Sequence, residues 1–72
     1  MYMNIKPGDI IRADDELRWA INNNVIVAII MLNQCVDVDV IENFNPYLIQ
    51  LPGNRFYFRD EIQIEVPPEA TL

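Results

Sequence analysis

The chain has 72 residues with 11 acidic and 5 basic side chains, no histidine and one cysteine, so its formal net charge is −6. A chain of this length forms one small domain with a limited core, and a single cysteine excludes an internal disulfide. The same counts disfavour a zinc site, and the acidic balance disfavours phosphate backbones and anionic membrane surfaces as partners.

Two Pro-Gly turns frame the chain, Lys6-Pro7-Gly8-Asp9 and Leu51-Pro52-Gly53-Asn54. Proline presets the backbone angle at the second position of a tight turn, and glycine tolerates the positive φ of the third. Residues 10–13 follow the first turn and predict a short strand, because β-branched residues suit a pleated surface.

Residues 14–21 contain the one predicted helix. Asp14 can cap it, and the apolar residues Leu17, Ala20 and Ile21 then fall on one stripe. The asparagines at 22–24 would end it, since asparagine tolerates the left-handed conformation. The alternative is an irregular loop held by Leu17 and Trp19.

Residues 25–32 are eight consecutive apolar residues. They predict a strand that is covered on both faces or has one face in an oligomer interface. Residues 35–41 then alternate, with valines at 36, 38 and 40 on one face and Asp37 and Asp39 on the other. This pattern predicts a half-buried strand with an aspartate face in solvent, and Cys35 is expected to behave as a buried small hydrophobe.

The second Pro-Gly turn joins residues 47–50 to residues 55–59, which predicts a β-hairpin. Phe56 and Phe58 share one of its faces, and Arg55, Tyr57 and Arg59 share the other, the only basic face of the chain. Residues 62–66 alternate and predict a last half-buried strand. The chain is therefore expected to be mainly all-β, with five or six short strands in a closed or nearly closed small barrel, since closure removes exposed strand edges.

Parts of the chain resemble SH3-like barrels, including those of the KOW type. Lys6-Pro7-Gly8-Asp9-Ile10-Ile11-Arg12 is similar to their opening strand. Tyr47-Leu48-Ile49-Gln50, Phe56-Tyr57-Phe58 and Glu61-Ile62-Gln63-Ile64 are similar to their last strands, where a hairpin is followed by a short turn and a terminal strand. The resemblance covers both ends of the chain and implies an SH3-like barrel, which we expect as one domain over residues 1–66. Pro67 and Pro68 cannot donate to a strand ladder, so a loose tail is expected at 67–72. It transfers no functional residue, since the glycine of KOW-type domains is missing between Gly8 and Gly53.

The side chains that carry catalysis are scarce. Serine is absent and Cys35 has no histidine to activate it, so an enzyme is not expected, nor is a cofactor. Asp37 and Asp39, with Glu42 nearby, could offer oxygens to a hard cation. A solvated strand face is the simpler interpretation, and no metal is expected.

The remaining interpretation is a non-enzymatic, acidic protein-binding module, and we expect it to be cytoplasmic because it has one cysteine and no evident signal peptide. The candidate contact residues are Trp19, Asp37, Asp39, Glu42, Arg55, Tyr57 and Arg59. Acids would attract a basic partner surface, and aromatic residues are enriched at interface hot spots. Such a short acidic chain fits a small regulator or inhibitor encoded by a phage or other mobile element.

Two alternatives stay open. Surplus apolar residues at 25–32 would suit a homo-oligomeric structural protein assembled through that strand. The face of Arg55, Tyr57 and Arg59 would suit a KOW-like module that stacks on nucleic acid.

Overall fold

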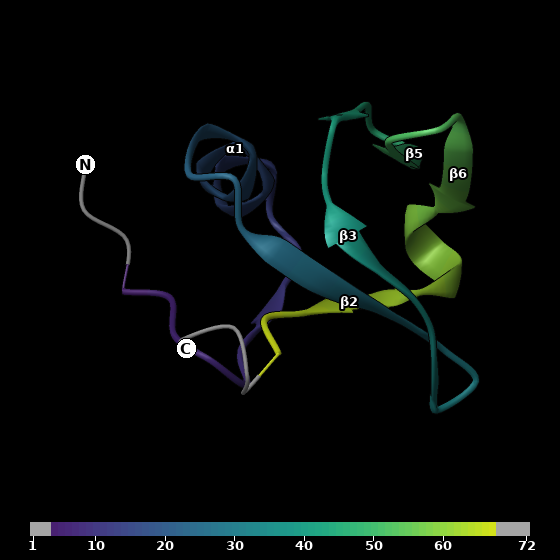
Figure 1. Ribbon diagram of the computed structural model, residues 1–72, viewed down its shortest axis with the longest axis horizontal. Coiled ribbons are helices and arrows are strands. Elements are labelled where there is room, and N and C mark those ends of the chain that lie inside the picture. The colour runs from purple at the N-terminus through teal and green to yellow at the C-terminus, as the bar shows by residue number, and fades with distance from the viewer. Residues whose placement is uncertain (1–3, 68–72) are drawn as a thin grey trace.

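The computed structural model describes residues 4–67, so residues 1–3 and most of the expected tail at 67–72 lie outside the described part. Its elements in chain order are β1 (Ile10–Ile11), α1 (Asp14–Asn22), β2 (Ile26–Met31), β3 (Gln34–Val40), β4 (Asn43–Phe44), β5 (Leu48–Leu51), β6 (Arg55–Phe58), the 3₁₀ turn η1 (Arg59–Glu61) and β7 (Gln63–Glu65). The prediction of a mainly β chain with one short helix is confirmed (Figure 1).

The strands form two antiparallel sheets, which we call sheet A, with the order β1-β7-β2-β3, and sheet B, with the order β4-β5-β6. The chain passes between the sheets twice, through residues 41 and 42 after β3 and through η1 after β6. The two sheets do not join into a closed barrel, because sheet A ends in the outer strands β1 and β3 and sheet B in the outer strands β4 and β6. The expected closure is therefore replaced by two layers connected at corners.

The helix begins and ends as its sequence indicates, with one change at the cap. Ala13 occupies the N-cap position in place of Asp14, and Glu16 Oε1 accepts hydrogen bonds from the backbone N–H groups of Ala13 and Arg12 at 3.0 and 2.8 Å. At the other end Asn23 Nδ2 donates to the Trp19 carbonyl at 2.8 Å, and Asn24 has φ 51°. Side-chain contacts thus satisfy backbone groups that any helix end leaves open.

Apolar side chains from both sheets and the helix form one core. Its buried members are Ile11, Leu17, Ala20, Val27, Ile29, Ile41, Ile49, Leu51, Ile64 and Val66. The apolar run at 25–32 becomes β2, which is paired on both edges, by β7 and by β3. Its residues Val27 and Ile29 are fully buried within the single chain, so the middle of this strand is committed to the core.

The strands β3 and β6 turn their charged residues inward and several of their apolar residues outward. Register pairs Val27 with Asp39 and Ile29 with Asp37, so both aspartates share the inner face of sheet A with buried residues. Val38 is 52% exposed and Phe58, on β6, is 55% exposed. The prediction that the aspartates form the solvent face of their strand is therefore wrong, and the physical reason is the ion pairing described below.

The β2–β3 hairpin ends in a two-residue turn that reaches away from the body, at the lower right of Figure 1. Leu32 and Asn33 form it with φ of 52° and 63°, the positive values that a type I′ hairpin turn requires. Leu32 is 89% exposed. Cys35, two residues after this turn, also differs from expectation, because it is exposed rather than buried.

We expect Leu32→Asn to stabilise the protein, because a left-handed backbone is costly for leucine and tolerated by asparagine. The gain is about 0.5–1 kcal/mol, which corresponds to a rise of several degrees in the thermal midpoint. Differential scanning calorimetry would measure it. The matched variant Asn33→Leu should lower the midpoint, and a fall for Leu32→Asn would contradict the assigned turn.

Candidate functional site

Arg55 joins β6 to β3, which are outer strands of different sheets. Its Nη1 donates to Asp37 Oδ1 and its Nη2 to Asp39 Oδ2, both on β3. Tyr57 Oη donates to Asp37 Oδ2 at 2.8 Å. Four of the predicted contact residues therefore lie together, but they bond to one another. Arg55 balances one of the two aspartate charges, so the cluster keeps one net negative charge.

The network shifts the ionisation of its members. The hydrogen bond from Tyr57 lowers the pKa of Asp37 most, with help from Arg55, and these effects outweigh burial, which acts in the opposite direction. The same bond, together with burial, raises the pKa of the Tyr57 hydroxyl. Burial acts to lower the pKa of Arg55, but its bonds to the two aspartates outweigh it and raise the value. The shifts of Asp37 and Arg55 favour their charged forms, and the shift of Tyr57 favours the neutral hydroxyl that donates to Asp37.

The aspartates also occupy backbone donors of β3. Asp37 Oδ1 accepts from the Val38 N–H at 2.9 Å, and Asp39 Oδ1 accepts from the Val40 N–H at 2.7 Å. An outer strand with free donors is a template for pairing with another chain. Two donors of β3 are already used within the strand, which disfavours strand addition there.

Arg59 lies apart from this network. Its Nη2 contacts Asp14 Oδ1 at 2.8 Å and donates to the Arg12 carbonyl at 3.0 Å, while its Nη1 donates to the Asn45 carbonyl at 2.7 Å. Its guanidinium also stands over the Phe44 ring, 5.6 Å from the centroid. Only 18% of the side chain is exposed, so Arg59 ties β1, α1 and β4 together rather than offering a free charge.

The two remaining predicted residues are separate from both clusters. Trp19 packs from α1 against the core and is half-buried. Glu42 is exposed at the bend between β3 and β4, where its backbone N–H donates to the Gln50 carbonyl at 2.8 Å. The structure thus brings together Asp37, Asp39, Arg55 and Tyr57 alone.

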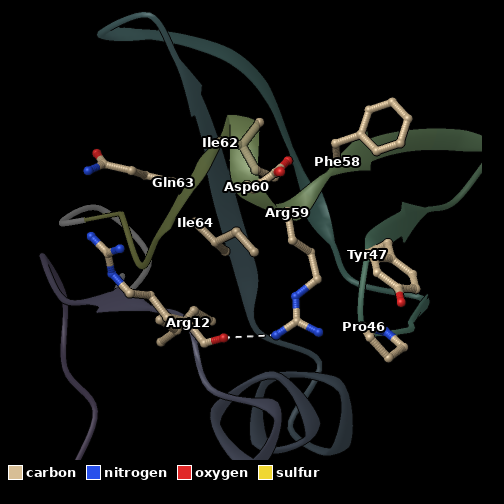
Figure 2. Close-up of a pocket in the computed structure, with 10 residues that line it drawn as sticks. Arg12, Pro46, Tyr47, Phe58, Arg59, Asp60, Ile62, Gln63 and Ile64 are labelled. Carbon is tan, nitrogen blue, oxygen red and sulfur yellow. Dashed lines mark hydrogen bonds between the residues drawn. The ribbon is translucent and has the colours of Figure 1, made fainter.

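A groove of about 450 Å³ opens beside η1, at the end of the two layers. It is lined by Ile11, Arg12, Pro46, Tyr47, Phe58, Arg59, Asp60, Ile62, Gln63 and Ile64. Figure 2 shows Arg59 crossing it, with Tyr47 and Phe58 on one side and Ile62, Ile64 and Gln63 on the other. Tyr47 is 74% exposed, so this groove places large aromatic surface in solvent.

A second hollow of about 300 Å³ continues the groove toward the hairpin tip at Leu32, since four lining residues are common to both: Arg12, Asp60, Ile62 and Gln63. The acidic pair Asp60 and Glu61 lines this part. Within residues 4–67 neither carboxylate takes part in an ion pair. The extended groove therefore combines exposed aromatic and aliphatic groups with the carboxylates of Asp60 and Glu61 and with exposed Arg12, which lines both of its parts.

Sequence reasoning missed this groove because four separate segments contribute to it. The available signals were the aromatic residue after Asn45-Pro46 and the acidic pair at 60 and 61, and neither pattern indicates a partner across the fold. Comparisons with protein-family models, curated proteins and solved structures found no match. The groove and the exposed faces are therefore the basis for assigning a function.

Two further properties bear on the type of site. Over residues 4–67 no three histidine, cysteine, aspartate or glutamate side chains lie close enough to hold a metal ion. In the same range no helix has the length and apolar character that crossing a membrane demands.

Proposed function

We propose that the protein is a non-enzymatic protein-binding module whose contact is the groove beside η1. The observation that carries this proposal is the exposure of Tyr47 and Phe58 on one side of a groove of about 450 Å³. Aromatic side chains in a water-accessible groove supply a large apolar contact, and they are enriched among residues that dominate binding energy.

The architecture that carries the groove is proposed to be an open variant of the SH3-like barrel. Two features support it. The β5–β6 hairpin is followed by the short turn η1 and by the terminal strand β7, as in the family it resembles. The opening strand β1 also pairs with β7, through Ile10 with Glu65 and Ile11 with Ile64.

The acidic part of the contact is assigned to Asp60 and Glu61. Asp37 and Asp39 were the sequence-based candidates, but both are bonded to Arg55. Asp60 and Glu61 are exposed and line the groove. The partner is therefore expected to present apolar and basic side chains together, with a contact that weakens as salt is added.

A nucleic-acid interface would need a free basic face. The face of Arg55, Tyr57 and Arg59, which the sequence predicted for this role, is not free. Arg55 and Tyr57 are turned toward Asp37, and Arg59 is bonded to Asp14. A guanidinium already paired with carboxylates has little to gain from a phosphate. A protein partner is thus the proposal we retain.

The proposal can be tested before the natural partner is identified. Peptides are selected from a displayed random library on the folded protein, and the affinity of the best binders is measured by calorimetry for Phe58→Ser and Phe56→Ser. Phe56 is the matched control, because it is 53% exposed on the same strand but does not line the groove. We expect Phe58→Ser to weaken binding at least about tenfold, as for a hot spot above 1.4 kcal/mol, and Phe56→Ser to leave it unchanged.

Selected peptides should be rich in lysine or arginine beside apolar residues, and their affinity should fall with salt. Failure to select any binder, or equal effects of the two serine variants, would contradict the proposal.

A further inference from the structure

Leu32, at the tip of the β2–β3 hairpin, contributes little to the stability of its own fold. Its φ of 52° is a left-handed value, which is costly for leucine and tolerated by asparagine. Its side chain is 89% exposed, so it gains almost nothing from burial. Folding therefore does not require a leucine at this position. Strained residues of this kind gather at functional sites, where a contact with a ligand is the reason for their presence.

The leucine stands at one end of the extended groove. Tyr47 and Phe58 line only the part beside η1, whereas Leu32 and Glu61 line only the second hollow. Asp60 lines both parts and so stands where they meet. The groove therefore presents three kinds of surface in a fixed order: exposed aromatic groups, an acidic middle and an exposed leucine.

The second hollow carries an excess of negative charge. Asp60 and Glu61 contribute two carboxylates to its lining, and Arg12 contributes one guanidinium. Arg12 forms no ion pair within residues 4–67, and Figure 2 shows its guanidinium well apart from the Asp60 carboxylate. The acids are therefore not neutralised in place, and a basic side chain of a partner gains from approaching them.

We propose that the partner of the groove is a protein segment with an apolar, a basic and a second apolar side chain in this order along the groove, the last of which packs on Leu32. The inference rests on the proposed function, and it adds which chemistry lies at each position. Charge complementarity favours this segment over an acidic one. The exposed leucine beside a hollow of about 300 Å³ favours it over a segment that is basic alone, because a second apolar side chain can bury that surface.

The probe is the set of peptides selected from a displayed random library on the folded wild-type protein, and calorimetry measures their affinity for each variant. We expect Leu32→Asn to weaken binding about tenfold while it raises the thermal midpoint, because it removes the apolar contact and relieves the turn. The opposite signs of the two effects separate a contact from a structural role. Val36→Asn is the matched control, since Val36 is 46% exposed on the same hairpin but lines neither part of the groove, and it should leave the affinity unchanged.

Two charge variants test the middle position. Glu61→Gln should weaken binding several-fold and Arg12→Gln should strengthen it several-fold, because the first removes an attraction to the basic side chain and the second removes a repulsion. Double-mutant cycles with alanine variants of a selected peptide test the order. One apolar residue of the peptide should couple to Phe58→Ser, and the other, beyond the basic residue, should couple to Leu32→Asn.

Circular dichroism would verify that each variant is folded, and Leu32→Gly replaces Leu32→Asn if the asparagine variant is not. The inference is overturned if Leu32→Asn binds as tightly as wild type, or if the selected peptides lack a basic residue between two apolar ones. If Phe58→Ser still weakens binding in that case, the groove remains the contact and only the role of Leu32 is wrong. Equal affinities of Phe58→Ser and Phe56→Ser, or no binder at all, would instead contradict the proposed function and this inference with it.

Discussion

Replacing Ile29 with alanine is expected to cost about 3–4 kcal/mol of unfolding free energy, because the cavity left by a buried isoleucine cannot fully close. Ile29 is fully buried in the middle of β2 and lies opposite both Ile64 and Asp37. A domain of this size has a total stability on the order of 5 kcal/mol. The variant should therefore be near the limit of folding.

Urea unfolding followed by circular dichroism measures this loss. Ile26→Ala is the control on the same strand, since Ile26 is half exposed and its truncation should cost less than about 1 kcal/mol. The two midpoints would coincide if β2 were not the centre of the core.

Asp37→Asn should have the second largest effect, a loss of about 2 kcal/mol at neutral pH. Asp37 accepts hydrogen bonds from Arg55, Tyr57 and Val38, and its side chain is only 13% exposed. The substitution removes the charge that Arg55 is paired with and turns one acceptor into a donor. Arg55 remains 38% exposed, so water compensates in part and the loss is smaller than for a fully buried pair.

This contribution depends on pH in a defined direction. The pKa of Asp37 is lowered in the folded protein, so its stabilisation is complete above the unfolded value of about 4 and is lost as the pH falls through the lowered folded value. Urea unfolding at pH 7 and near pH 2.5 should therefore give a large difference between wild type and Asp37→Asn at the first pH and a small one at the second.

Asp60→Asn is the matched control, because Asp60 is exposed and forms no ion pair within residues 4–67. It should leave stability nearly unchanged at both values of pH. An Asp37→Asn deficit that persists undiminished in acid would show that the carboxylate charge is not what stabilises the network.

Local patterns were sufficient for the individual elements. The Pro-Gly turn at residues 52 and 53 predicted the hairpin that became β5–β6, and Gly53 has the positive φ, 82°, that such a turn needs. The acidic start and asparagine-rich end of residues 14–24 predicted α1. Each of these signals acts within a few residues along the chain, so no distant contact was required to interpret it.

The orientation of β3 and β6 could not be obtained in this way. Alternation defines two faces of a strand, but only the surroundings decide which face is buried. For β3, the bond to Arg55 keeps the aspartate face inward. Arg55 follows Asp37 by 18 positions and belongs to the other sheet. Paired carboxylates lose the penalty that keeps an isolated charge out of the interior, and the valines then face solvent.

The groove has a tertiary origin as well. Tyr47, Phe58 and Asp60 become neighbours only because η1 carries the chain from sheet B to sheet A. The sequence by itself determined the turns, the helix and the strand segments, because hydrogen bonding and backbone preference act locally. Tertiary structure alone decided which charges neutralise one another and which apolar faces remain open, because ion pairing and burial depend on residues that folding brings together.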